Sequence, residues 1–360
     1  MRRLIGTIAA ILTGSASVAT ACGFHNYVPQ PTLVDRLIDS EHIVLARQDP
    51  ENPFRYKVMT ALEGGADNVH LPHLVDSVSR RRLTVDPDAH VLFAREGAYG
   101  PWQRVAFIDD EMRPVLNTVV TQLSEWQLGE DQNRFQTFAA YLNHPDKRVR
   151  TLALRELDRA DYGFLISNKI PVDKDQILAE FNIPEQRELR AIRVLLLGLA
   201  GGDGIRDRLE QGLDAAIDYE NSLTGAYATA LIELDGPDRA STLAQRYLTD
   251  PKVPETSKEA LIEALALHSQ YGDTQMNSVV ADVVADILRQ APQLAPAVAR
   301  QFGARQVWSQ RDALATLVRD GSLNSPLDVL AISQYVAVAD DLTGSINLIE
   351  GENSDNGVFE

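Results

Sequence analysis

The sequence predicts an α+β protein of several domains, in which a small β-barrel or β-sandwich is followed by an α-helical solenoid. Three observations support this fold class. Residues 22–115 contain short apolar runs separated by turn residues, whereas residues 116–340 carry apolar positions at the helical period. Residues 1–21 have the composition of an export signal. The last segment, 341–360, is acidic and polar, and we expect it to be disordered.

The N-terminus has the three regions of a signal peptide. Arg2 and Arg3 supply a basic start, and residues 4–18 form an apolar stretch that is too short to remain as a membrane-spanning helix. Residues 19–21 read Ala-Thr-Ala, which is a signal-peptidase cleavage pattern, and Cys22 follows directly. We therefore expect the protein to be exported, with Cys22 as the first residue of the mature chain.

Cys22 is the only cysteine of the chain, and its position at the cleavage point leaves three interpretations. Residues 19–22 resemble the lipobox of bacterial lipoproteins, although Ala19 stands where leucine is usual. This resemblance implies a lipid anchor on Cys22. Alternatively, cleavage after Ala21 leaves a free N-terminal thiol, or the cysteine lies in a discarded segment. A lone cysteine excludes an intramolecular disulfide, so the fold rests on its hydrophobic core.

The chain is acidic, with 51 Asp and Glu residues against 34 Lys and Arg residues and a formal net charge of −17. Nucleic-acid binding requires a basic surface. The longest basic run is the three arginines at 80–82, which we interpret as a solvated strand edge or loop. We therefore expect no nucleic-acid partner. The acidic excess favours a cation or a basic partner protein.

The β-rich region is expected to begin with a short helix at residues 33–38. Six strands then follow, separated by Gly, Pro, Asp and Asn, at residues 41–47, 54–62, 69–74, 81–85, 90–95 and 103–108. Five or six short strands at this spacing favour a small barrel or sandwich.

The helical region contains about ten or eleven amphipathic segments joined by short turns. The clearest apolar stripe runs from Val280 to Leu288. Comparable apolar positions recur at intervals of 40, 35 and 34 residues, namely Leu152, Ile192, Tyr227 and Leu261. This interval is typical of paired-helix repeats, in which each pair buries its apolar face against the next pair.

One stretch, residues 138–160, resembles a HEAT repeat. A first helix ends at Leu142, a turn contains Pro145 and Asp146, and Arg150 lies in the first turn of a second helix. The resemblance implies that Asp146 and Arg150 connect neighbouring repeats. Residues 185–199 look like another second helix. A tetratricopeptide-like or irregular α-solenoid is the alternative architecture.

The N-terminal region is faintly similar to the OB-type domains of netrins and metalloproteinase inhibitors. A mature chain that starts at Cys22 is followed by a small barrel, whose second strand ends at Leu62-Glu63-Gly64. Those domains carry several disulfides, which this chain cannot form. The resemblance therefore implies a fold only.

A metal site near the N-terminus is a second hypothesis. Cys22 and His25 form a Cys-x-x-His pair, and thiolate, imidazole and the free amino terminus are good ligands for transition metals. Lipidation of Cys22 would remove both the thiol and the amine. No Gly-x-Ser-x-Gly or His-Glu-x-x-His segment occurs, and we expect neither an enzyme nor a cofactor.

These observations favour an exported, lipid-anchored binding or scaffold protein of the bacterial periplasm, which holds a partner protein on its helical repeats. Arg148 and Arg150, followed by Arg155 and Arg159, are expected on the partner-binding surface or, with Asp146, between repeats. Two alternatives stay open, a metal-binding or inhibitory N-terminal module and a periplasmic hydrolase with converging carboxylates. The sequence indicates no oligomeric state.

Overall fold

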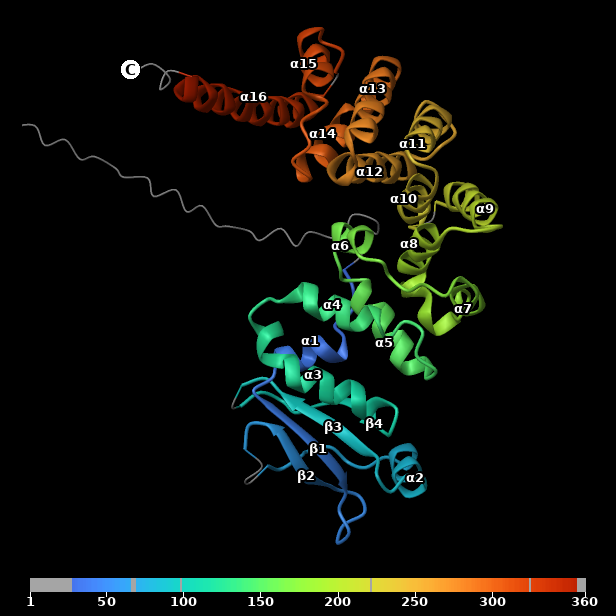
Figure 1. The fold of residues 1–360 in the computed structure, drawn as a ribbon, viewed down its shortest axis with the longest axis vertical. Helices are drawn as coiled ribbons and strands as arrows, with labels where there is room; N and C mark the ends of the chain where they lie inside the picture. Colours follow the sequence, from blue (N-terminus) through green and yellow to red (C-terminus); the bar gives the residue numbers. More distant parts are fainter. Residues whose placement is uncertain (1–27, 66–68, 98, 221, 324, 355–360) are drawn as a thin grey trace, which may run out of the picture.

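The computed structural model describes residues 28–65, 69–97, 99–220, 222–323 and 325–354, with side chains up to residue 342. This part of the chain is mostly helical and contains one small antiparallel sheet near its N-terminal end (Figure 1). The predicted α+β class is confirmed at this level. The predicted signal peptide, Cys22 and His25 lie outside the described residues.

The sheet has four strands: β1 (His42–Gln48), β2 (Tyr56–Glu63), β3 (His90–Arg95) and β4 (Gln103–Ile108). Their order is β2-β1-β3-β4, and all neighbours are antiparallel. Strands β2 and β4 therefore form the two edges of an open sheet. The sequence predicted a barrel or a sandwich in this region. Within the described residues, the structure has a single open sheet instead.

Both faces of the sheet are buried, because helices cover each of them. These helices are α1 (Leu33–Ile38), α2 (Ser77–Val85) and α3 (Met112–Gln127). Ile43 and Leu92 pack into a core shared with α1 and α3, whereas Val44 and Phe93 pack into a second core that includes Leu83 of α2. Alternate residues of one strand thus point to opposite faces.

Two of the six predicted strands are wrong. Residues 81–85 belong to helix α2, which begins at the N-cap Asp76, whose carboxylate accepts a hydrogen bond from the Ser79 N–H at 2.8 Å. A run of five residues is too short for its alternation to exclude a helix. Residues 69–74 form only one isolated bridge, between Arg55 and Leu74.

The helical region begins at Met112, and its first helices pack directly against the sheet. After α3 come α4 (Asp131–Ala139), α5 (Lys147–Leu157), α6 (Tyr162–Ser167), α7 (Lys174–Glu180) and the 3₁₀ turn η1 (Pro184–Leu189). Helix α3 contacts both α1 and β4, and its buried residues Val115 and Leu116 join the core of the sheet to the core of the helices. The predicted domain boundary at residue 116 falls inside α3.

The later helices form two rows. The first row contains α8 (Arg190–Ala200), α10 (Thr224–Asp235), α12 (Glu255–Tyr271), α14 (Ala295–Ala304) and α16 (Pro326–Ser354). The second contains α9 (Ile205–Asp218), α11 (Pro237–Leu243), which continues as η2 (Ala244–Leu248), α13 (Thr274–Gln290) and α15 (Arg311–Arg319). A turn of 3₁₀ helix, η3 (Pro292–Leu294), precedes α14.

Each helix of the first row packs against the next one along that row, from α8 to α16, and α11 packs against α13 in the second row. Figure 1 shows the two rows as an arc with α9, α11, α13 and α15 on its outer side. Helices α8 and α10 approach each other closely at Gly198. A Cβ added at Gly198 would lie 2.7 Å from the Cα of Ala230. A residue without a side chain is therefore required at this crossing.

Helix α16 continues through residues 341–354, which the sequence predicted to be disordered. Among the residues that the structure describes, no helix combines the length and the apolar character that crossing a bilayer requires.

Candidate functional site

The first turn of α5 carries the residues for which the sequence predicted a role in binding or in linking repeats. Asp146 is the N-cap of α5, and its carboxylate accepts the Arg148 N–H at 2.7 Å. The Arg148 guanidinium contacts Asp146 at 2.6 Å and reaches Asp109, just after β4, at 2.7 Å. Hydrogen bonds from Arg148 lower the pKa of Asp146 to about 2. Arg148 therefore connects α5 to the sheet.

Arg150 connects α5 to the following helix. Its guanidinium donates to the carbonyl groups of His144 and Pro145, both at 2.7 Å, and pairs with Glu180 on α7. The second carboxylate oxygen of Glu180 lies 3.7 Å from Arg193 of α8, which is fully buried. Burial lowers the pKa of Arg193. Arg150 thus connects α5 to α7, and its role between HEAT repeats stays a prediction.

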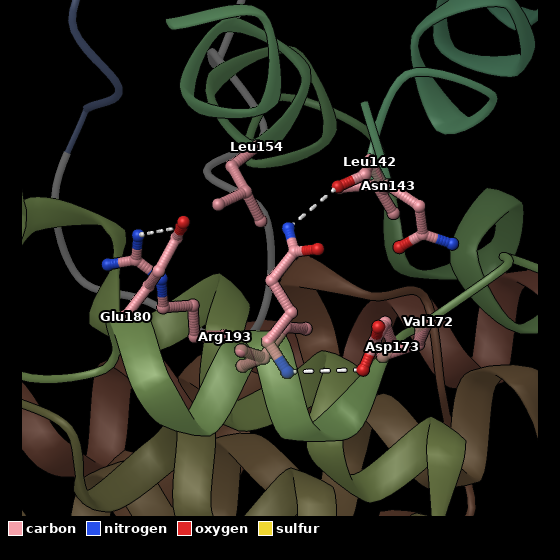
Figure 2. Close-up of a pocket in the computed structure, with 9 residues that line it drawn as sticks. Leu142, Asn143, Leu154, Val172, Asp173, Glu180 and Arg193 are labelled. Carbon is pink, nitrogen blue, oxygen red and sulfur yellow. Dashed lines mark hydrogen bonds and ion pairs between the residues drawn. The ribbon is translucent and has the colours of Figure 1, made fainter. Parts of the chain in front are cut away.

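Figure 2 shows a pocket with Glu180 and Arg193 on one side and Leu142, Asn143 and Asp173 on the other. Its volume is about 10 Å³, which is close to the space that a single water molecule needs. This pocket therefore has no room for a substrate, and Arg150, Glu180 and Arg193 form a structural network there.

A much larger cleft lies on the other side of α5. Its volume is about 770 Å³, and it separates β4 and α1 from α5 and η1. Five apolar residues contribute to its lining: Leu33, Val105, Ala106, Met112 and Leu152. Five basic residues contribute as well: Arg36, Arg104, Lys147, Arg148 and Arg155. Glu185 is the one acidic residue that lines it.

The charge of the cleft is opposite to that of the chain. Three of its basic side chains are neutralised by neighbours, since Arg104 pairs with Asp76 at 2.6 Å, Arg155 pairs with Glu188 at 3.1 Å, and Arg148 is paired as described above. Within the described residues, the Arg36 guanidinium donates one hydrogen bond, to Gln103 at 3.4 Å. Lys147 makes no ion pair within the described part of the chain. Arg36 and Lys147 are both exposed, and against the single carboxylate of Glu185 they leave the lining with a small excess of positive charge.

A buried ion network holds the walls of the cleft together. Arg134 of α4 pairs with Asp35 of α1 at 2.7 Å and with Glu156 of α5 at 2.6 Å. Arg134 is 4% exposed and Glu156 is fully buried. Burial raises the pKa of Glu156. Burial also opposes ionisation of Asp35, but the Thr32 N–H and Arg134 outweigh it and lower the pKa of Asp35. These contacts fix α1 relative to α5.

A second buried network joins α6 to α10 and α12. The Tyr162 hydroxyl donates to Glu233, and it lies 2.9 Å from Nε2 of His268. Nδ1 of His268 donates to the Ala264 carbonyl at 2.9 Å. Burial raises the pKa of Tyr162, and hydrogen bonds from His268 and Tyr162 lower the pKa of Glu233. Tyr162 and His268 are 2% and 4% exposed, so a substrate does not reach them.

The two alternative functions, a hydrolase and a metal-binding module, depend on other residues. Burial raises the pKa of the carboxyl groups of Glu156 and Glu263, but each pairs with an arginine and neither lines the cleft. Within the described residues, no group of three or more His, Cys, Asp or Glu side chains is arranged to hold a metal ion.

The sequence predicted Arg148 and Arg155 as surface residues, and both line the cleft. It missed Arg36, Arg104 and Lys147. Arg36 and Arg104 belong to α1 and β4, which lie about 110 and 40 residues before α5, and no local spacing connects them to it. Lys147 directly precedes Arg148, and this pair was the one available signal.

No family model matches the chain, and neither the curated proteins nor the solved structures include one with significant similarity to it.

Proposed function

We propose that the protein is an exported, lipid-anchored, non-enzymatic scaffold that holds a partner protein, and that the cleft beside β4 is where the partner binds. The observation that carries this proposal is the charge of the cleft. Five basic side chains and one acidic one line it, in a chain whose net charge is −17. Apolar residues accompany the basic ones in its lining. This combination suits an acidic segment with apolar side chains on a partner.

The helices after residue 116 are proposed to form a HEAT-like α-solenoid. The stacking of α8, α10, α12, α14 and α16 in one row supports this architecture, as does the packing of α11 against α13 in the other. The placement of Arg150 between α5 and α7 agrees with the role that the HEAT resemblance implies. A stack of this kind offers an extended surface that a partner can use in addition to the cleft.

The proposed lipid anchor would place the cleft close to a membrane. Pro31, which lines the cleft, follows Cys22 by nine residues. Nine residues span at most about 30 Å when fully extended. A partner held in the cleft would therefore lie near the periplasmic surface of the membrane to which Cys22 is anchored. An intact mass of the mature protein tests this step, because diacyl or triacyl modification shifts the mass, whereas an unmodified Cys22 contradicts the anchor.

The binding proposal is tested by reversing the two unneutralised charges. The double variant Arg36→Glu/Lys147→Glu is compared with Lys57→Glu/Arg319→Glu, which makes the same change of net charge at exposed residues of β2 and α15. Protein is purified from envelope membranes in mild detergent, and stoichiometric partners are identified. We expect a partner that is recovered with the wild type and the control but lost from the cleft variant. Equal recovery with both variants would contradict the proposal.

A further inference from the structure

The lining of the cleft contains three consecutive residues of β4, Arg104, Val105 and Ala106. Successive side chains of a strand point to opposite faces of a sheet. At the bulge in β4 this alternation is interrupted: Arg104 pairs with Asp76 at α2 on one face, whereas Val105 and Ala106 pack against the core of α1 and α3 on the other. A cleft that is lined from both faces follows the edge of the strand. The wall of the cleft on this side is therefore the open edge of the sheet.

The backbone of this edge is free to pair. Strand β4 bonds to β3 alone, since it is the last strand in the order β2-β1-β3-β4. Half of the N–H and C=O groups of an edge strand point away from its neighbour. On β4 these groups meet no other backbone segment among the residues that the structure describes. Val105 is the extra residue of a bulge, between the pairs Leu92–Ala106 and Phe93–Arg104. The bulge interrupts the regular edge, which restricts pairing to a short strand.

We propose that a short extended segment of the partner adds to β4 as a fifth strand. This inference rests on the proposed function, and it specifies the conformation and the chemistry of the ligand. Main-chain hydrogen bonds to β4 would supply affinity, and side chains on alternate positions would supply specificity. Apolar side chains of the segment contact Leu33, Val105 and Ala106, the apolar lining residues that are partly exposed. Acidic side chains meet Lys147 and Arg36. The segment is thus one in which apolar and acidic residues alternate.

Charge and shape distinguish this edge from the other one. Strand β2 also lies at an edge of the sheet, but it contributes no residue to the lining of this cleft, and it exposes Met59 and Lys57. Lys57→Glu is therefore a matched control for Lys147→Glu, because each variant reverses one exposed lysine near one edge of the same sheet.

The probe is a labelled, acetylated peptide of eight residues in which valine and glutamate alternate. Two control peptides have the same side chains but carry N-methyl groups at every second residue. One version lacks the N–H donors on one edge of the extended peptide, and the other version lacks those on the opposite edge. Binding to the full mature protein is measured by fluorescence anisotropy. We expect at least one N-methylated version to bind about tenfold or more weakly than the parent peptide, and Lys147→Glu but not Lys57→Glu to weaken the parent by about the same factor.

Amide hydrogen exchange supplies a readout that side-chain contacts alone would not change. We expect the parent peptide to slow exchange at β4, within residues 103–108, and not at β2. Binding that is sensitive to Lys147→Glu, but that tolerates all N-methyl groups and leaves β4 unprotected, would overturn strand addition while retaining the cleft as a binding site. Absence of peptide binding, or binding that Lys147→Glu leaves unchanged, would overturn both proposals. If the protein binds phosphatidylglycerol vesicles through the cleft, so that Lys147→Glu weakens this binding, and does not bind the peptide, the ligand of the cleft is a lipid surface and both proposals of a protein partner are overturned.

Discussion

Replacement of Arg134 by methionine tests whether the buried network determines how α1, α4 and α5 are held together. Methionine keeps most of the volume of the arginine stem but removes the charge. Glu156, which is fully buried, then loses the guanidinium that lies 2.6 Å away. Removal of one partner from a buried ion pair costs about 3–5 kcal/mol. Asp35 retains Arg159 at 3.4 Å, so we expect Arg134→Met to cost about 3 kcal/mol, at the lower end of that range.

The pH dependence of this loss has a definite sign. Burial raises the pKa of Glu156, and loss of Arg134 raises it further. A carboxyl group whose folded pKa lies above its unfolded pKa destabilises the protein increasingly as the pH rises through the folded value. The variant should therefore lose more free energy of unfolding at pH 8 than at pH 5, because Glu156 takes up a proton at the lower pH.

Urea unfolding followed by circular dichroism and tryptophan fluorescence at the two pH values measures this loss. Trp126, whose ring centre is 6.1 Å from that of Phe138 on α4, reports on this region. Arg159→Met is the matched control, because its guanidinium lies farther from Asp35 and is 31% exposed. The double variant Arg134→Met/Glu156→Leu should recover much of the stability. A cost for Arg134→Met below about 1 kcal/mol, or one that does not change with pH, would refute the reasoning.

Three further predictions concern single contacts. Asp146→Ala should lower the free energy of unfolding by about 1 kcal/mol through loss of the α5 N-cap, while Asp146→Asn should retain most of the cap, as measured by urea unfolding. Gly198→Ala should cost about 1–3 kcal/mol because its Cβ would overlap the backbone of α10, whereas Gly65→Ala, with open space around it, should stay within about 0.5 kcal/mol. Tyr162→Phe should cost about 1–3 kcal/mol at pH 7 and less in acid, once the pH falls below the lowered pKa of Glu233 and its carboxylate is protonated; a loss that does not decrease as the pH falls would contradict this.

The helical region could be predicted well because its apolar stripes are long. The stripe from Val280 to Leu288 lies on a single buried face of α13, since seventeen residues give the helical period room to repeat. The strands at 90–95 and 103–108 were also predicted with the boundaries that the structure shows. The strand predicted at residues 81–85 is wrong because a run of five residues fits both the helical and the strand period. The N-cap Asp76, which shows that a helix begins there, lies outside this run.

The cleft could not be predicted because it depends on contacts between distant segments. Its positive charge is local, and the net charge of −17 pointed instead toward a basic partner. Arg134 illustrates the same limit. It lies in a polar stretch of α4 and looks like a surface residue in the sequence. In the structure it pairs with Asp35, which lies about 100 residues earlier in the chain, and with Glu156, which lies 22 residues later. Only the folded chain brings these charges together.

The contact of Tyr162 with α10 and α12 has a mechanical consequence. Helices α8, α10, α12, α14 and α16 each pack against the next one along their row. The hydroxyl of Tyr162 joins α6 to α10 through Glu233 and to α12 through His268. A displacement of α12 would thus pass directly to α6 through this bridge.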